Sequence, residues 1–187
     1  AVDCRTGRKV WETPNPRKST MSHSSVMPMK ENGKKIYVYA AIGGLCGIAA
    51  DGPGRGTVVW ETSEFAPSVV APSPIIMNDG YIFMTAGYGA GSSLLKTDVR
   101  NGSVRLIRLY RPSEGLASEQ QTPIYINGYL YGIQPKDAGG LRNQFVVTAA
   151  LNPEKIVISS GKNERFGLGP YIFADGKFFI LNDDGEM

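Results

Sequence analysis

The sequence predicts an all-β protein built from a repeated unit of about 47 residues, and three observations support this prediction. An Asn-Gly or Asp-Gly turn recurs along the chain, and an aromatic-rich run follows each turn. The glycines of these turns are separated by 80−33 = 47, 128−80 = 48 and 176−128 = 48 residues. No stretch shows a sustained helical period. The four turns are Asn32-Gly33, Asp79-Gly80, Asn127-Gly128 and Asp175-Gly176.

Each turn lies inside a predicted β-hairpin that supplies the first and second strands of a unit. A proline opens the short apolar run before each turn, and proline fits the first residue of a strand because it has no backbone donor. Asn-Gly or Asp-Gly between apolar runs favours a hairpin, because a type I′ turn needs positive φ at both central residues. The four prolines are Pro28, Pro74, Pro123 and Pro170.

A second hairpin is expected to supply the third and fourth strands of each unit. The predicted strand pairs are 1–3 with 9–13, 48–51 with 57–62, 95–98 with 104–107, and 149–152 with 155–158. Trp11 and Trp60 lie in fourth strands, 60−11 = 49 residues apart, and we expect each to pack against the adjacent sheet. Leu106 takes the place of the Trp in the third copy, and the last copy has lost both the Gly and the Trp.

Four short antiparallel strands per repeat is the composition of a β-propeller blade. We expect one propeller domain over 1–187, with half blades at 1–13 and 168–187. Full blades are expected at about 24–62, 70–109 and 120–159. The chain then holds about four blade equivalents. We expect them to be part of a larger propeller of six to eight blades, since closure removes open sheet edges. The alternative is a closed ring of four in which the two half blades complete one blade.

The second hairpin resembles the blade signature of the quinoprotein-like (PQQ-like) propeller repeat family, roughly Ala-Leu-Asp-x-x-Thr-Gly-x-x-x-Trp. Val2-Asp3, Thr6-Gly7 and Trp11 match it at full spacing. Ala50-Asp51, Gly56 and Trp60 match with one more residue in the turn, and Asp98, Gly102 and Leu106 match in part. The segment 174–181 looks like the first hairpin of that family, so the resemblance covers essentially the whole chain.

The resemblance implies two different kinds of function. Some members are periplasmic alcohol or sugar dehydrogenases that hold pyrroloquinoline quinone and calcium in the funnel. Others, such as the outer-membrane assembly lipoprotein, are protein-binding scaffolds without a cofactor. The dehydrogenases use two adjacent cysteines over the quinone, whereas Cys4 and Cys46 lie far apart in this sequence. We expect the two to form no disulfide and to behave as small apolar residues.

We therefore expect a non-catalytic binding or scaffold module without a cofactor, located in the bacterial periplasm or outside the cell. The first alternative is a segment of a quinone-dependent alcohol or sugar dehydrogenase, for which pyrroloquinoline quinone and calcium would be the cofactors. The second is a carbohydrate-binding or carbohydrate-acting propeller, suggested by polar and aromatic residues in the long connections.

Composition narrows the class of partner. Twenty Lys and Arg against 17 Asp and Glu give a net charge of only +3, and the basic residues are scattered. The densest basic cluster, at 5–9 and 17–18, is typical of a solvated rim rather than of a nucleic-acid site. No apolar run reaches the roughly 18 residues that a membrane span needs. We expect a protein or a small polar ligand as the partner, with no nucleic acid and no membrane span.

The long connections predict where that partner binds. In an up-and-down blade, the connections between second and third strands and the crossovers between blades share one side, which we call the loop face. Long loops on a rigid scaffold are where binding usually occurs. The opposite side, formed by the other hairpin turns, is expected to have short connections and is called the turn face. The long connections are 14–24, 62–72, 86–92, 110–121, 134–143 and 159–168.

Eight residues of the loop face are candidate binding residues. Those just before each first strand should point toward the channel mouth, and Tyr88 should form an aromatic lip with Tyr110 and Phe166. Arg111, Arg142 and Arg165 suit a carboxylate because Arg presents a bidentate fork; ion pairs with nearby Glu are the alternative. The candidates are His23, Ser24, Tyr88, Arg111, Glu119, Gln120, Gln121 and Arg165.

Other local patterns favour structural roles. Ser25, Ser73, Thr122 and Gly169 are polar or small at matching positions, either to bind a ligand or because the channel narrows there. His23 is the only histidine, and a zinc site needs three or four protein ligands. The segment 183–186 lacks the ligand ladder of a calcium loop. No Gly-x-Ser-x-Gly motif is present, so we predict no catalytic and no metal-binding residues.

Overall fold

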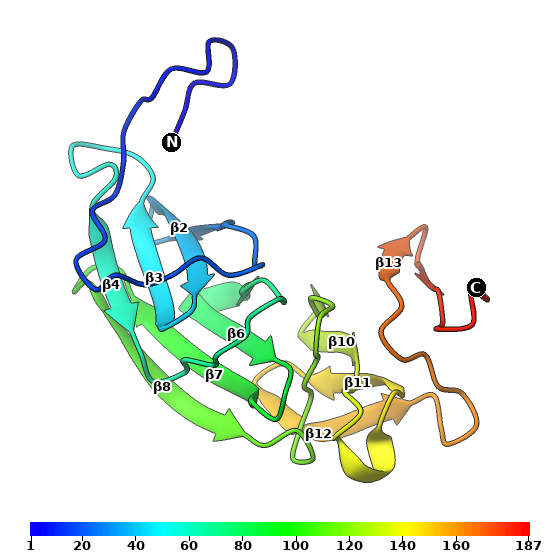
Figure 1. The fold of residues 1–187 in the computed structure, drawn as a ribbon. Helices are drawn as coiled ribbons and strands as arrows, with labels where there is room; N and C mark the ends of the chain where they lie inside the picture. Colours follow the sequence, from blue (N-terminus) through cyan, green and yellow to red (C-terminus); the bar gives the residue numbers. More distant parts are fainter.

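The computed structural model describes all 187 residues, and it contains three four-stranded sheets and one two-stranded sheet (Figure 1). Blade 1 is β1 (Met27–Glu31), β2 (Lys34–Ala41), β3 (Gly44–Ala49) and β4 (Val58–Thr62). Blade 2 is β5 (Ile75–Ile76), β6 (Tyr81–Ala86), β7 (Gly91–Asp98) and β8 (Ser103–Tyr110). Blade 3 is β9 (Ile124–Ile126), β10 (Tyr129–Ile133), β11 (Phe145–Ala149) and β12 (Asn152–Ser159). The terminal hairpin is β13 (Tyr171–Ala174) and β14 (Lys177–Ile180).

Every sheet is antiparallel, and its strands are paired in chain order. The only helices are the 3₁₀ turns η1 (Asn78–Gly80) and η2 (Gly139–Leu141). Successive blades follow one another along a curved arc (Figure 1). This architecture confirms the predicted all-β fold of propeller blades.

The two terminal segments do not come together. Residues 1–13 form no strand, and their only β-bridge is between Val2 and Lys9, while β13 is paired with β14 alone. They lie at opposite ends of the arc (Figure 1). In this structure the halves therefore do not complete a single blade, as the four-bladed ring would require.

The repeated turn residues adopt the backbone that the sequence predicts. Each of the four turns has positive φ at both central positions, for example 50° at Asn32 and 80° at Gly33. Asn and Gly tolerate this left-handed region better than other residues do, which is why the two-residue connection forms there.

The third strands and some connections differ from the sequence prediction. β3 and β11 begin four residues before the expected 48–51 and 149–152, and β11 ends where that predicted strand begins. β3 and β7 start with runs rich in small residues, Gly44–Cys46 and Gly91–Ser93, so these starts lack an apolar alternation, whereas β11 starts with the large apolar residues of 145–147. The connection between β2 and β3 is only Ile42 and Gly43, whereas 50–57 on the turn face is longer than expected.

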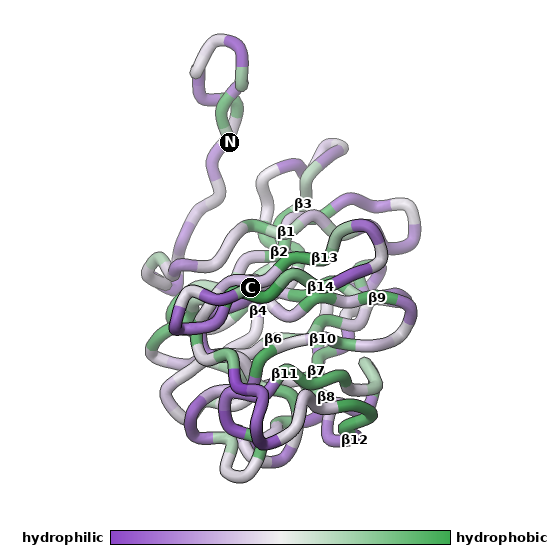
Figure 2. The backbone as a smooth tube through the Cα atoms, turned by 90° about the vertical axis from the view of Figure 1, so that its right-hand side faces the viewer, coloured by the Kyte–Doolittle hydropathy of each residue, from purple (hydrophilic) through white to green (hydrophobic).

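The core lies between successive blades rather than within one sheet. The first interface joins Ile36, Val38 and Trp60 of blade 1 to Ile82 and Met84 of blade 2. The second joins residues such as Phe83 and Leu94 to Leu130 and Val146 of blade 3. Apolar segments coincide with the strands in Figure 2, and hydrophilic segments with many of the connections. Both faces of blade 2 are therefore buried.

Aromatic rings fill the interface between blade 3 and the terminal hairpin. Phe178 lies 4.9 Å from Tyr131 and 5.0 Å from Phe145, centroid to centroid. Ile172 and Phe179, paired on the opposite side of this hairpin, are 60% and 40% exposed. Only one side of the terminal hairpin is thus packed.

Trp60 occupies the predicted position, whereas Leu106 is not its equivalent. Trp60 is 3% exposed and packs toward blade 2. Its register partner in the β3–β4 pairing is Gly47. Gly44 and Gly91 lie against equivalent carbonyls of their fourth strands, at Thr62 and Tyr110. Trp60 lies two residues before Thr62, and Arg108 lies two residues before Tyr110. Arg108, not Leu106, is therefore the structural equivalent of Trp60. Leu106 packs toward blade 1 instead and is the equivalent of Val58, since the β3–β4 and β7–β8 pairings have a bulge at the same place. Trp11 is half-buried and stacks on Tyr37 of blade 1.

Candidate functional site

The loop face is held together by a relay of hydrogen bonds that joins successive blades. The Ser25 backbone N–H donates to Ser73 Oγ at 2.8 Å, and the Ser73 N–H donates to Thr122 Oγ1 at 2.9 Å. Tyr171 Oη donates to the Thr122 carbonyl at 3.1 Å. Each step joins residues 48 or 49 positions apart, about one repeat. Ser73 and Thr122 therefore connect blades. This role differs from the two that the sequence left open for them, ligand binding and a narrow channel.

The crossover that contains Glu119 is fixed by buried hydrogen bonds on both sides. The Ser118 N–H donates to Thr85 Oγ1 at 2.8 Å, and Ser118 Oγ donates to the Ile133 carbonyl at 3.0 Å. Gln134 is 1% exposed; its Oε1 accepts from the Ala117 N–H, and its Nε2 donates to the Gly115 carbonyl. Blades 2 and 3 thus hold this crossover in one position. Gln134 was not among the binding residues that the sequence predicted.

Tyr88 lies at the tip of the turn between β6 and β7, and its side chain is exposed. It has φ 57°, and its exposed fraction is 67%. A bulky residue in the left-handed region is a genuine outlier, and such strain is found disproportionately at functional sites. No contact of the ring with Tyr110 or Phe166 is found, so the predicted aromatic lip consists of Tyr88 alone.

Two carboxylate side chains flank this turn. The Glu119 side chain runs against the Cα of Gly87, so closely that a β-carbon there would overlap it. On the other side, a β-carbon on Gly89 would lie 3.9 Å from Asp137 Oδ2. Glu119 is only 6% exposed and has no hydrogen-bond or ion-pair partner. The sequence predicted Glu119 but not Asp137, because 137 and 89 become neighbours only when blades 2 and 3 pack.

Gln120 and Gln121 line a pocket of about 380 Å³ between blade 3 and the terminal hairpin. Its other walls are Thr122, Leu168, Pro170 and Tyr171. Gln121 Nε2 donates to the carbonyls of Gly167 and Gly169, at 3.3 and 2.9 Å. The Gln121 amide is therefore engaged in holding the hairpin, while Gln120 is exposed at the pocket.

The predicted arginines are bound to groups of the protein itself. Arg111 forms two side-chain hydrogen bonds with Glu114 Oε1, through Nε at 2.8 Å and through Nη2. The same contacts lower the pKa of Glu114 and raise that of Arg111. Arg165 donates from Nη1 to the Arg142 carbonyl at 2.6 Å and from Nε to the Lys162 carbonyl. Arg111 thus forms the alternative rim ion pair, and Arg165 connects two loops.

His23 and Ser24 lie on the connection that leads into β1. His23 is exposed, and its backbone N–H donates to the Val70 carbonyl at 2.9 Å. Ser24 Oγ donates to the Ala40 carbonyl at 2.9 Å, so this hydroxyl is used by blade 1. A binding role for any of the eight predicted residues stays a prediction.

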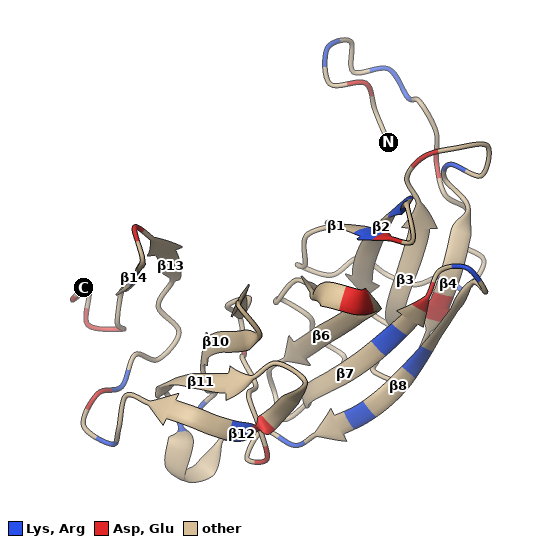
Figure 3. Cartoon of the chain, turned by 180° about the vertical axis from the view of Figure 1, so that it is seen from behind, with Lys and Arg blue, Asp and Glu red and all other residues tan.

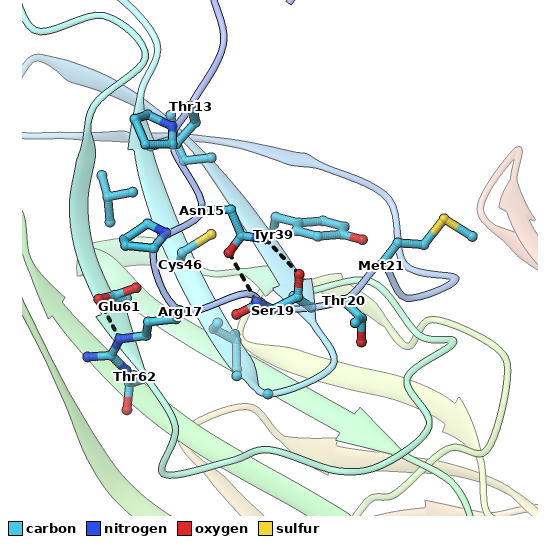
Figure 4. A pocket seen from close by; sticks show the side chains of 18 residues that line it. Thr13, Asn15, Arg17, Ser19, Thr20, Met21, Tyr39, Cys46, Glu61 and Thr62 are labelled. Atoms are coloured by element: carbon cyan, nitrogen blue, oxygen red, sulfur yellow. Dashed lines mark hydrogen bonds and ion pairs between the residues drawn. The ribbon is translucent and has the colours of Figure 1, made fainter.

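A second pocket, which the sequence did not predict, lies under the connection 13–21 (Figure 4). Its volume is about 280 Å³, and Tyr39, Cys46 and Glu61 contribute to its wall. The connection is held by the Arg17–Glu61 ion pair at 2.6 Å and by reciprocal hydrogen bonds between Asn15 and Ser19. Burial, and then the charge of Glu61, raise the pKa of the Cys46 thiol. Cys46 is a weak nucleophile for that reason.

Neither cysteine forms a disulfide, as the sequence predicted, but Cys4 is exposed rather than packed like an apolar residue.

No cluster of three or more His, Cys, Asp or Glu side chains able to hold a metal ion is found. None of the helices has the length and apolar character that crossing a membrane requires. Charged side chains of both signs are spread over the strands and connections (Figure 3). Within the basic cluster, Lys9 and Arg17 form ion pairs with Glu12 and Glu61.

Comparison with known proteins supports the fold. No protein-family model matches the sequence, and no curated protein matches it. The structure is similar to the crystal structure of BamB from Moraxella catarrhalis, with a TM-score of 0.51 and 16% sequence identity. The match covers 99% of this chain and 55% of the BamB chain, so this chain spans about half the length of BamB. At this identity the similarity shows the fold alone.

Proposed function

We propose that this chain is a non-catalytic binding module whose loop face takes up a protein partner outside the cytoplasm. The observation that supports it is the contrast on that face between a rigid frame and exposed groups. The frame is the relay through Ser73 and Thr122 together with the Gln134 hydrogen bonds. Tyr88 and Gln120 extend from this frame into solvent. Preorganised exposed groups lower the ordering cost of association.

The extracytoplasmic location and the scaffold role both derive from resemblance. The repeats resemble the quinoprotein-like family, which includes cofactor-free scaffolds, and the fold is similar to that of BamB. Cys4 and Cys46 are both free. The blades are held together by the hydrophobic cores between them, so the protein needs no disulfide for this purpose outside the cytoplasm.

Site-specific photocrosslinking in the source organism tests this proposal. A photoreactive residue is placed at Gln120 or His23 on the loop face, and at Asn101 or Asp175 on the turn face as matched exposed controls. We expect protein adducts from the loop-face positions only. Equal adducts from both faces, or adducts from the turn face alone, would contradict the proposal. Fractionation of the same cells then shows whether the protein lies outside the cytoplasm.

The dehydrogenase alternative has its own measurement. The full protein is titrated with pyrroloquinoline quinone and calcium, and binding is followed by calorimetry and absorbance. We expect no stoichiometric binding. Stoichiometric binding together with dye-linked oxidation of an alcohol or a sugar would replace the scaffold proposal with an enzymatic one.

A further inference from the structure

Two carboxylates and one tyrosine surround the same turn of the loop face, the segment Gly87–Ala90. Glu119 lies against Gly87, and Asp137 lies beside Gly89, with Tyr88 between these two glycines. The crossover fixes Glu119 on one side, and the β10–β11 connection positions Asp137 on the other. The three side chains come from three separate connections and two blades.

Glu119 is mostly buried, but its carboxylate reaches the surface without a partner. Its exposed fraction is 6%, and its carboxylate has neither a hydrogen bond nor a cation. Its oxygens are not among the fully buried atoms that lack a partner, so an incoming group can contact them. The neighbouring polar groups Ser118 and Gln134 donate to carbonyls rather than to Glu119. Glu119 therefore retains full capacity to accept hydrogen bonds from an incoming group.

Asp137 and Tyr88 extend the same chemistry to the surface. Asp137 is exposed, and its carboxylate has no partner in the protein. Tyr88 is two-thirds exposed, so one face of its ring is available for a ligand cation to stack on. Glycine would adopt the backbone conformation of position 88 without strain, whereas the tyrosine found there is strained.

The surroundings of the turn are negatively charged. Glu64 and Glu114 line the pocket of about 350 Å³ that Gly89 and Ala90 close, and Arg111 is the cation of that pocket. Arg111 is neutralised by its ion pair with Glu114, whereas Glu119 and Asp137 beside the turn have no cation partner, so the unpaired charge next to the turn is negative. This contrasts with the overall net charge of +3. A positively charged ligand is favoured at this position.

We infer that the turn Gly87–Ala90 binds an arginine or lysine side chain of a basic peptide segment, with Tyr88 under the cation and Glu119 and Asp137 as its carboxylate partners. This inference rests on the proposed function and names the chemistry of the partner for that face. An arginine suits the site best, because its planar guanidinium both stacks on an aromatic ring and forms hydrogen bonds at its edge.

The test is fluorescence anisotropy of the full protein with a fluorescein-labelled arginine–glycine–serine repeat peptide. The same peptide with glutamate in place of arginine is the matched ligand control. We expect binding of the arginine peptide only, weakening as salt is added because the contacts are partly exposed. Equal binding of both peptides, or of neither, overturns the inference. So does displacement by a neutral oligosaccharide that binds on its own, which would make this a sugar site.

Variants then assign the binding to this turn. Glu119→Gln should weaken binding by about 10-fold, since a charge-assisted hydrogen bond to the cation is lost. Asp137→Asn should weaken it by about 2- to 5-fold, as for an exposed ion pair. Tyr88→Ala should cost about 2- to 5-fold, whereas Tyr88→Phe should retain affinity because the ring is kept.

Controls separate binding from folding and from the broader proposal. Asp175→Asn removes one exposed charge on the turn face and should leave affinity unchanged. Melting temperatures of Glu119→Gln and Asp137→Asn identify any variant that binds poorly because it is unfolded. Unchanged affinity in the folded Glu119→Gln and Asp137→Asn double variant overturns the inference. The crosslinking pattern of the loop face tests the proposed function independently of that result.

Discussion

At the scale of single residues, Tyr88 is stabilised by nothing that the structure shows. Its φ of 57° costs a side chain with a β-carbon about 1–2 kcal/mol, whereas glycine adopts that region freely. Its ring is exposed, so burial does not offset this cost. A residue that is unfavourable for folding and displayed to solvent is typical of a binding position.

Tyr88→Gly should therefore stabilise the protein relative to Tyr88→Ala by about 1 kcal/mol, because both lose the ring and only alanine keeps the β-carbon. Urea denaturation of the two variants measures this difference in the free energy of unfolding. Equal stabilities would show that the backbone at this position is not strained. The glycine variant should also lose affinity for the arginine peptide, separating stability from binding.

Trp60 is the opposite case, a residue selected by packing. It is 3% exposed and joins blade 1 to blade 2, although its Nε1 has no hydrogen-bond partner. Trp60→Ala should lower the free energy of unfolding by about 3–5 kcal/mol, as large core truncations do. Trp60→Phe should cost less, because it retains most of the apolar area and leaves no buried donor unpaired. A melting temperature unaffected by the alanine variant would contradict this placement.

At the scale of elements, the small polar residues before the first strands connect one blade to the next. Ser73→Ala removes the acceptor of the Ser25 N–H and should cost about 1–2 kcal/mol, which includes the unpaired donor that remains. Thr122→Val should have a similar effect on the Ser73 N–H. Thermal denaturation measures both, with exposed Ser113→Ala as the control. Loss of no stability in either variant would show that the relay does not hold the blades.

The turns between third and fourth strands depend on an aspartate of the repeat signature. Asp98 accepts hydrogen bonds from the backbone N–H groups of Arg100 and Asn101 and from Asn101 Nδ2. Asp3 accepts equivalent bonds from Arg5 and Thr6. These hydrogen bonds explain why the signature has Asp at this position. They also lower the pKa of both carboxyl groups.

The lowered pKa predicts how this turn responds to pH. The folded protein favours ionised Asp98, so its stabilisation is present above the unfolded-state pKa and is lost as pH falls through the lowered folded-state pKa. NMR titration of the Asp98 carboxyl carbon should give a midpoint below the ordinary range of aspartate. The Asp98→Ala variant should be less stable than the wild type at neutral pH, and this difference should shrink in acid. A midpoint at or above the ordinary value would refute the turn contacts.

At the scale of the whole molecule, stability is distributed unevenly along the arc. Blade 2 is packed on both faces, and Ile82, Phe83 and Met84 are fully buried. The terminal hairpin is packed on one face only, and residues 1–13 have a single bridge. Hydrogen exchange should therefore be slowest in β6 and β7 and fastest in 1–13, with β13 and β14 in between. Uniform protection along the chain would contradict this order.

The features that could be predicted from the sequence are those determined by residues within a short segment of chain. Asn32-Gly33 and its repeats adopt positive φ because few other residue pairs do, so each hairpin could be predicted from a short segment. The starts of β3 and β7 could not be predicted in this way, since the small residues Gly44 and Gly91 are there to let a neighbouring strand approach. Likewise, Arg108 rather than Leu106 is the equivalent of Trp60, because the connection between third and fourth strands is 50–57 in blade 1 but only 99–102 in blade 2.

The sequence by itself determined the repeat, the order of strands and turns within it, and the side of the blades on which most long connections lie. Only the tertiary structure decided which side chains on that side are free. Arg111 and Gln121 are engaged by neighbouring groups, whereas Glu119 and Asp137 are brought to the Tyr88 turn without partners. The physical reason is that turn chemistry acts within a few residues, while the partners of a side chain come from the adjacent blade, about one repeat away, where packing and bulges set the register.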